Sequence, residues 1–226
     1  MTGGMSMAQQ PTGNRRLQWP DRFGALVWLA GVALFFALHL YAEAAWKNPD
    51  YSWAANNISD LGNVYCQPWG DDRRFVCSPR HDAMNAGFVI QGAAMLIGLA
   101  AVSLRRAGSA RTWTAGALLL AAGAGWILAG VWPADVNENR HVLGALLIMI
   151  LGNIGLALGP AMPAEPRRLR WTAPVLGAAG IAGAALFFTG NDLGWGLGGM
   201  ERVAAYPMLA WMLISGLVIL FGRRAH

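Results

Sequence analysis

Long apolar stretches, separated by short polar segments, dominate the chain. Six of the stretches are long enough for helices that cross a bilayer, which takes about 20 residues. Charged residues are almost absent inside them, and polar, Gly- or Pro-containing segments mark their ends. The pattern therefore predicts an all-α polytopic integral membrane protein. The six predicted transmembrane helices cover residues 23–45, 83–104, 112–132, 142–160, 172–190 and 204–222.

Four pairs of arginines flank these stretches and predict how the chain is oriented. The pairs are Arg15-Arg16, Arg105-Arg106, Arg167-Arg168 and Arg223-Arg224. Cytoplasmic loops retain Lys and Arg, so both termini are predicted to be cytoplasmic, in a protein of the plasma membrane. Eleven of the 17 basic residues then lie inside, with only Asp21 and Glu165 of the 12 acidic residues. The net charge of +5 thus reflects membrane topology and does not indicate nucleic-acid binding.

The composition supports this interpretation. Only 13% of the residues are charged, about half of what is usual in soluble proteins. We expect a cytoplasmic, partly disordered N-terminal tail over residues 1–22 and one transmembrane domain over residues 23–222. Residues 223–226 would form a second cytoplasmic tail.

The N-terminus allows one other interpretation. Ala42-Glu43-Ala44 has the small-x-small pattern of a signal-peptide cleavage site. The apolar run before it, residues 23–42, is longer than the roughly 7–15 residues of a signal-peptide core. An uncleaved first helix is therefore the preferred prediction.

One connection is long, residues 46–82, and it contains both cysteines, Cys66 and Cys77. The predicted topology places this loop outside, where a disulfide can form. Closing a loop of this size contributes about 3 kcal/mol in the chain-entropy model. Two metal-bound thiolates are the alternative, but the spacing is not that of a zinc site.

Three short motifs resemble an uncharacterised family of prokaryotic membrane proteins, the domain of unknown function 998. They are Ile58-Ser59-Asp60-Leu61-Gly62, the Asp135-Val-Asn137 turn, and His141-Val-Leu-Gly-Ala145. The resemblance extends from about residue 24 to residue 222 and implies no established activity. More remotely, the six-helix plan is similar to eukaryotic membrane families involved in lipid-anchor remodelling and lipid asymmetry. That likeness implies membrane lipids as partners.

Polar residues gather at the predicted outer ends of the helices. His39 and Glu43 are four residues apart and share one helix face. Ionisable groups near a bilayer are costly and are functional candidates by default. The predicted catalytic residues are His39, Glu43, Asp60, His81 and His141. The predicted substrate-binding residues are Ser59, Arg80, Asp82, Asn85, Asp135, Arg140 and Glu201.

These residue types suggest several chemistries. His39, His81 and His141 could bind a transition metal such as zinc, which would activate water beside a lipid ester or phosphate. Two of the histidines could instead be axial ligands of a haem. Without a cofactor, a His–carboxylate pair could act as general base, with Ser59 or water as nucleophile. Arg80 and Arg140 would then hold a phosphate group.

A purely structural interpretation competes with these chemistries. His81 and His141 would cap or bridge helix ends, through ion pairs with Asp82, Asp135 or Glu138. The sequence contains no recognised metallohydrolase spacing, nucleophile elbow or phosphate-binding loop.

The leading hypothesis is a membrane-embedded hydrolase or transferase for lipid or lipid-linked substrates. A non-catalytic protein that binds lipid, or stabilises a protein partner through the outer loop, is second. A small-solute transporter is third, because few polar residues interrupt the helices.

Overall fold

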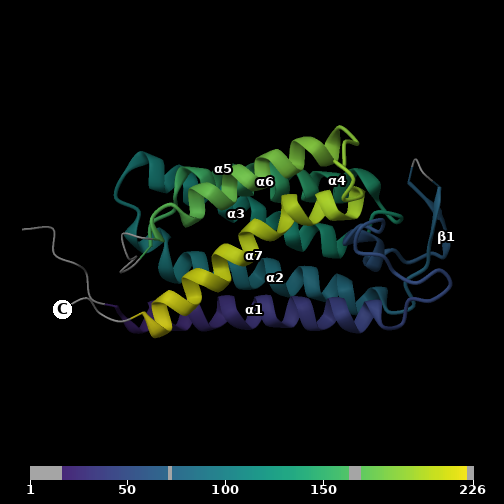
Figure 1. Cartoon of the computed structure of the whole chain (residues 1–226). Helices are drawn as coiled ribbons and strands as arrows, with labels where there is room; N and C mark the ends of the chain where they lie inside the picture. Colours follow the sequence, from purple (N-terminus) through teal and green to yellow (C-terminus); the bar gives the residue numbers. More distant parts are fainter. Residues whose placement is uncertain (1–16, 71–72, 163–168, 223–226) are drawn as a thin grey trace, which may run out of the picture.

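The apolar stretches form helices that run along a common direction (Figure 1). The computed structural model describes residues 17–70, 73–162 and 169–222. The helices are α1 (Trp19–Glu43), α2 (His81–Val102), α3 (Ala110–Val131), α4 (Glu138–Leu146), α5 (Asn153–Leu158), α6 (Thr172–Phe188) and α7 (Leu197–Phe221). A short 3₁₀ turn, η2 (Leu104–Arg106), follows α2. The predicted all-α fold is confirmed.

Five spans within the described residues are long and apolar enough to cross a membrane. One of them, Glu138–Leu158, consists of α4, the π-helix η3 (Leu147–Gly152) and α5. The sixth, α6, is equally apolar but has only 17 residues, or about 25 Å of helix, which is near the lower limit for a span. The chain is therefore a multi-pass membrane protein.

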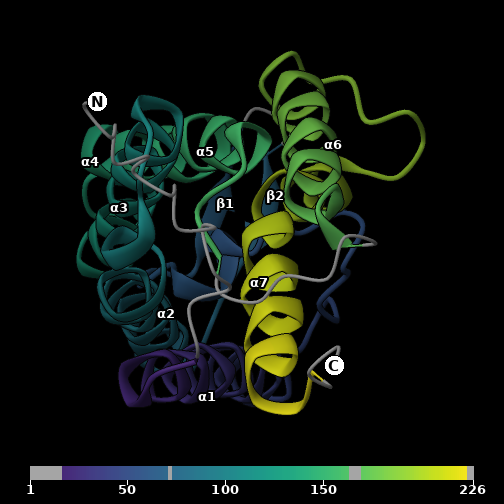
Figure 2. The same ribbon diagram turned by 90° about the vertical axis from the view of Figure 1, so that its left-hand side faces the viewer.

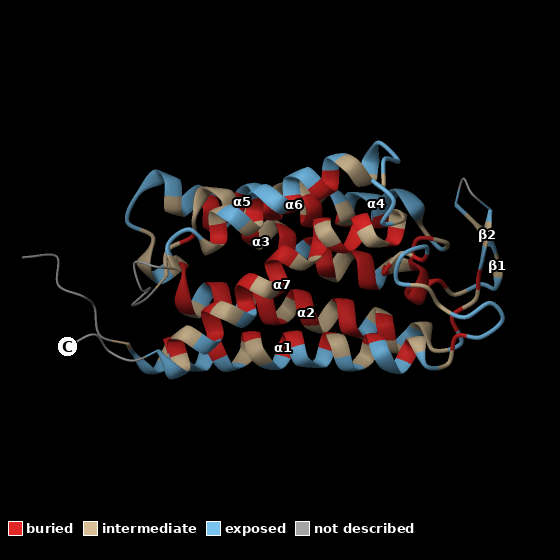
Figure 3. Ribbon diagram, viewed as in Figure 1, coloured by how far each residue is buried: buried red, intermediate tan, exposed pale blue. Residues whose placement is uncertain are grey.

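The helices pack as a bundle around an aromatic core. Neighbours in the bundle are α1 with α2 and α7, α2 with α3, α5 with α6, and α6 with α7 (Figure 2). The Phe35 ring lies at the centre and contacts the rings of Phe88, Trp126 and Tyr206. Buried residues lie on the facing sides of the helices, and exposed ones on the outward sides (Figure 3).

A buried amide explains where the fourth span departs from α-helical geometry. The Asn153 Nδ2 atom donates to the carbonyl oxygens of Met149 and Ala204, each at 2.7 Å. The first bond pairs a carbonyl group of the π-helix, and the second ties this span to α7. Gly180 of α6 faces the same amide, and a Cβ atom there would overlap it. A side chain at residue 180 would therefore separate α6 from the fourth span.

Most helix ends agree with the prediction within four residues, but the last helix does not. It begins at Leu197, not at residue 204, directly after Gly196, whose φ of 76° favours glycine. Glu201 and Arg202 therefore lie inside α7, where contacts with the loop bury both charges. Likewise, α1 begins at Trp19, so the predicted tail over residues 1–22 extends too far. The rest of that tail up to residue 16, and the predicted tail 223–226, lie outside the described residues.

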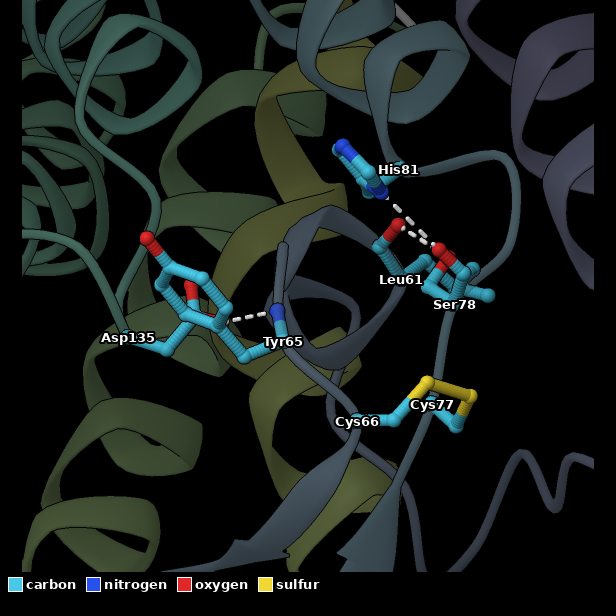
Figure 4. The surroundings of a disulfide bond; sticks show 7 residues. All are labelled: Leu61, Tyr65, Cys66, Cys77, Ser78, His81 and Asp135. Atoms are coloured by element: carbon cyan, nitrogen blue, oxygen red, sulfur yellow. Dashed lines mark hydrogen bonds between the residues drawn. A yellow bond between two sulfur atoms is a disulfide. The ribbon is translucent and has the colours of Figure 1, made fainter.

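Residues 44–70 and 73–80 fold over one end of the bundle, which we call the loop end (Figure 1). They contain a 3₁₀ helix, η1 (Ser59–Gly62), and a hairpin of β1 (Gln67–Trp69) and β2 (Arg74–Val76). The predicted disulfide is confirmed: Cys66 and Cys77 are bonded next to the Gln67–Val76 pair and close the base of the hairpin (Figure 4).

At the opposite end, one of the four arginine pairs lies within the described residues. Arg106 forms a bidentate ion pair with the fully buried Asp21, with N–O distances of 2.5 and 2.8 Å. Arg105 donates to Oε1 of Gln18 at 2.8 Å. These contacts join the start of α1 to the residues that follow α2.

Candidate functional site at the loop end

A buried arginine holds the first half of the loop on the bundle. The Arg202 Nη1 atom donates to the carbonyl oxygens of Trp53, Asn56 and Gly198, at 2.8, 2.9 and 2.7 Å. Its Nη2 atom donates to the Tyr51 hydroxyl at 2.5 Å, and the guanidinium lies 4.8 Å from the centre of the Trp53 ring. One side chain of α7 thus fixes residues 51–56.

Tyr51 continues this connection. Its hydroxyl accepts from Arg202 and donates to the carbonyl oxygen of Asn57 at 2.9 Å. Burial raises the pKa of the Tyr51 phenol far above its usual value, although the neighbouring guanidinium of Arg202 opposes the shift. The phenol is therefore neutral at physiological pH and remains a hydrogen-bond donor.

Two buried carboxylates hold the next segment. Glu201, beside Arg202 on α7, accepts from the backbone N–H of Ile58, directly before η1. Asp60, in η1, is 1% exposed and forms a bidentate ion pair with Arg74 of β2, with both N–O distances 2.8 Å. Asp60 therefore joins the first half of the loop to the hairpin.

Two more of the predicted site residues hold the loop near α1. Glu43 accepts from the Trp53 indole at 3.0 Å. Arg80 donates to the Tyr41 carbonyl at 2.9 Å, and its guanidinium lies 4.0 Å from the centre of the Tyr41 ring. Arg80 thus contacts the end of α1 in the structure, and its predicted phosphate contact stays a prediction.

Asn85 and Asp135 also bind loop backbone. Asn85 donates to the carbonyl oxygen of Gly62 at 2.9 Å. Asp135 accepts from the backbone N–H of Tyr65 at 2.7 Å (Figure 4). Five of the twelve predicted site residues therefore join the loop to the bundle: Glu43, Arg80, Asn85, Asp135 and Glu201.

The three predicted histidine ligands occupy different environments. His39 is fully buried: its ring stacks on Trp53 at 4.7 Å between centroids, and neither ring nitrogen has a hydrogen-bond partner in the structure. His81 lies at the start of α2, with Nδ1 3.0 Å from the Ser78 carbonyl and Nε2 3.3 Å from Asp82 (Figure 4). These contacts match the structural interpretation of the sequence, in which His81 bridges groups at a helix end.

His141 binds the C-terminal end of α3. Its Nδ1 atom is 3.0 Å from the Trp132 carbonyl oxygen, and the neighbouring Arg140 stacks on the Trp132 ring at 4.1 Å. A carbonyl oxygen can only accept, so Nδ1 carries the proton and, in the neutral ring, Nε2 is left as a hydrogen-bond acceptor.

The structure does not assemble the predicted metal site. Within the described parts of the chain, no group of three or more His, Cys, Asp or Glu side chains is placed to hold a metal ion. His39, His81 and His141 lie on α1, α2 and α4, and each has its own neighbours. The described residues therefore offer no set of ligands for a transition metal, and the metal cofactor stays a prediction.

Three predicted site residues do share one hollow at the loop end. Ser59 of η1, His141 of α4 and Glu201 of α7 line a small, partly open hollow, in which the centre of a water molecule has about 20 Å³ of free space. Trp126 also lines it, and the buried indole N–H of this residue has no hydrogen-bond partner in the structure. The other lining residues are apolar: Ile58, Phe88, Ala129, Ala145, Ile148, Met149 and Ala205.

Ile148 and Met149 belong to the π-helix, and π-helical turns occur frequently at functional sites. The sequence analysis did not single out Ile148, Met149 or Trp126. No local signal marks a π-helix in an apolar run, and Trp126 resembles the other tryptophans of the helices. The hollow with Ser59, His141, Glu201 and Trp126 is the candidate functional site.

The fold and this hollow define a class: a polytopic helical membrane protein with a loop-covered polar site at one end. The sequence profile of the family described as protein of unknown function (DUF998) matches residues 29–218. The chain belongs to this family. Comparison with curated proteins and with solved structures gives no match.

Proposed function

We propose that this membrane protein binds the polar group of a membrane lipid, or of a lipid-linked molecule, in the hollow at the loop end. The observation that carries the proposal is the convergence of Ser59, His141 and Glu201, from three separate elements, on one space with otherwise apolar walls. Hydroxyl, imidazole, carboxyl and indole groups offer donors and acceptors, and the apolar walls suit an amphiphile.

The proposal includes an orientation. Both termini are cytoplasmic in this proposal, because four arginine pairs of the sequence adjoin the apolar stretches on the side of the chain termini, and one pair, Arg73-Arg74, lies in the loop. The loop end then lies at the outer surface of the plasma membrane, and the hollow lies in the outer leaflet. Lipids of that leaflet are accordingly the expected ligands.

Native mass spectrometry of the purified protein, released from lipid nanodiscs, tests this function. We expect one lipid to remain bound to the wild type under activation that strips the annular lipids. His141→Ala should reduce the retained fraction at least severalfold. His81→Ala is the matched control, since His81, like His141, lies in the first turn of a helix at the loop end but is not part of the lining of the hollow. Equal retention by wild type and His141→Ala, both folded, would refute the proposal.

A second function is favoured by the hydrogen bond of His141. Because Nδ1 donates to Trp132, Nε2 of the neutral ring is free to act as a base, and His141 lines the hollow together with Ser59. A hydrolase or transferase that acts on an ester or phosphate of the bound lipid would use these groups. The test is release of a fatty acid or head group from reconstituted lipid. If the protein has this function, the release is lost in both His141→Ala and Ser59→Ala.

The other hypotheses stay predictions. A protein partner would have to bind the outer surface of the loop, and transport of a small solute would need a path beyond the hollow.

A further inference from the structure

The fourth span changes its neighbours along its length. At the end opposite the loop, α5 packs against α6, and also against α3. At the loop end, the extensive contacts of α4 with other described helices are confined to α3 and to η3, which continues it. Figure 2 shows the result: α5 lies between α4 and α6, whereas α4 lies on the side of α3, away from α6 and α7. The π-helix is the point at which the span changes course.

The hollow occupies the space that this divergence opens. Its walls include His141, Ala145 and Met149 on the fourth span, and Glu201 and Ala205 on α7. The first three are four residues apart and therefore share one face of the span. The last two are likewise four residues apart on α7.

Next to these lining residues, the surface of α4 is apolar and exposed. Val142 and Leu146 are 41% and 40% exposed, and both lie three residues from Ala145 or Met149 on the same helix. Positions three and four apart are neighbours on a helix surface. The lining face therefore continues directly into an exposed apolar face, which in a membrane contacts lipid.

We propose that the space between α4 and α7 is a lateral entrance, through which an acyl chain of an outer-leaflet lipid reaches the hollow. This inference rests on the function proposed above and names the ligand's route and class. The order of the groups along the entrance matches that of a lipid. Ser59, in the loop, and Glu201, which contacts the loop, lie toward the loop end, and Ile148, Met149 and Ala205 lie farther from it.

A water-soluble ligand fits the structure less well. It would have to pass the loop, where Ile58 and Ser59 form part of the lining of the hollow. That segment is held in place by Glu201, and its neighbours by Arg202 and the Asp60–Arg74 ion pair. Entry from the bilayer needs none of these contacts to break.

Photo-crosslinking tests the entrance. The protein is reconstituted in nanodiscs with a phospholipid that carries a diazirine on its acyl chain, and crosslinked peptides are identified by mass spectrometry. We expect crosslinks to concentrate in residues 142–149. Ala145→Trp, which fills the entrance, should lower the yield there about fivefold or more. The matched control is Ala182→Trp, an exposed position on α6, which should leave the yield unchanged.

A second version avoids variants that fail to fold. Both natural cysteines are in the disulfide, so a single introduced Ala145→Cys thiol can be labelled with a bulky maleimide in detergent, before reconstitution. Labelling should lower the crosslink yield at residues 142–149, and labelling of Ala182→Cys should not. The lateral entrance is refuted if blocking residue 145 leaves the yield unchanged, or if crosslinks spread evenly over the exposed faces of all helices.

The two proposals fail in distinguishable ways. If His141→Ala abolishes lipid retention but blocking residue 145 has no effect, the hollow binds lipid and the lateral route is wrong. If blocking residue 145 lowers the crosslink yield but His141→Ala does not reduce lipid retention, an acyl chain lies along α4 and the proposed polar binding site is refuted.

Discussion

At the scale of single residues, Arg202 has the largest structural role at the loop end. Its guanidinium makes four hydrogen bonds, three to carbonyl oxygens and one to Tyr51, and it is 7% exposed. The rigid fork of donors in arginine suits several acceptors at once, which a lysine could not match. The loop covers the Arg202 guanidinium and supplies most of its acceptors. The guanidinium in turn holds the loop backbone in this conformation.

We therefore expect Arg202→Met to detach the first half of the loop. Loss of the donors leaves three carbonyl groups and a phenol without their partner, which should cost about 3 kcal/mol or more of stability. Thermal unfolding in detergent and chymotrypsin cleavage near Tyr51 and Trp53 measure the effect. Arg80→Met is the control, since Arg80 makes one hydrogen bond at the surface, and its loss should cost about 1 kcal/mol. Equal effects of the two substitutions would contradict this account of Arg202.

At the scale of elements, the loop consists of two parts that are held differently. Residues 51–62 are fixed by side chains of the helices: Glu201 and Arg202 of α7, Glu43 of α1 and Asn85 of α2. The β1–β2 hairpin is fixed by the Cys66–Cys77 disulfide and by the Asp60–Arg74 ion pair. The hairpin strands have three residues each and are too short to be stable alone.

Replacing both cysteines by serine should therefore loosen the hairpin selectively. The chain-entropy model gives a loss of about 3 kcal/mol for a loop of this size. Limited proteolysis should cut the double variant within residues 66–77 and leave residues 51–62 intact. A reducing agent should produce the same pattern in the wild type and no further change in the variant. Cleavage of the whole loop at equal rates would show that the two parts are not independent.

At the scale of the whole molecule, the charges predict which side of the membrane each end faces. The connection between α6 and α7 lies at the loop end, and the connection between α2 and α3 lies at the opposite end. With cytoplasmic termini, as proposed, the first of these connections is outside the cell and the second is in the cytoplasm. The short α6 still has to cross, with about 25 Å of helix, and a shorter span is accommodated by local thinning of the bilayer.

Single cysteines test this topology in a background without the natural pair. On intact cells, a membrane-impermeant maleimide should label Asn191→Cys, an exposed position between α6 and α7. It should not label Ser109→Cys, an exposed position between α2 and α3, until the cells are opened. The reverse pattern would overturn the proposed orientation, and labelling of both would indicate that α6 or another span does not cross.

The sequence by itself determined the class of protein, most of the helix ends and the disulfide. These features depend on local properties: the length of an apolar run, the residues at its ends, and a single pair of cysteines in one loop. It also found Ser59, His141 and Glu201, because ionisable and polar residues stand out against apolar runs. It could not separate them from Glu43, Asp60, Arg80 and Asn85, which have the same character and dock the loop.

Only the tertiary structure decided which polar side chains meet. A transmembrane helix is apolar on nearly all sides, so its sequence does not show which face turns toward the bundle. The separation of His39, His81 and His141, the π-helix stabilised by Asn153 and the burial of Arg202 all follow from contacts between distant segments. The hollow has the same origin, because it exists where α4 diverges from α7.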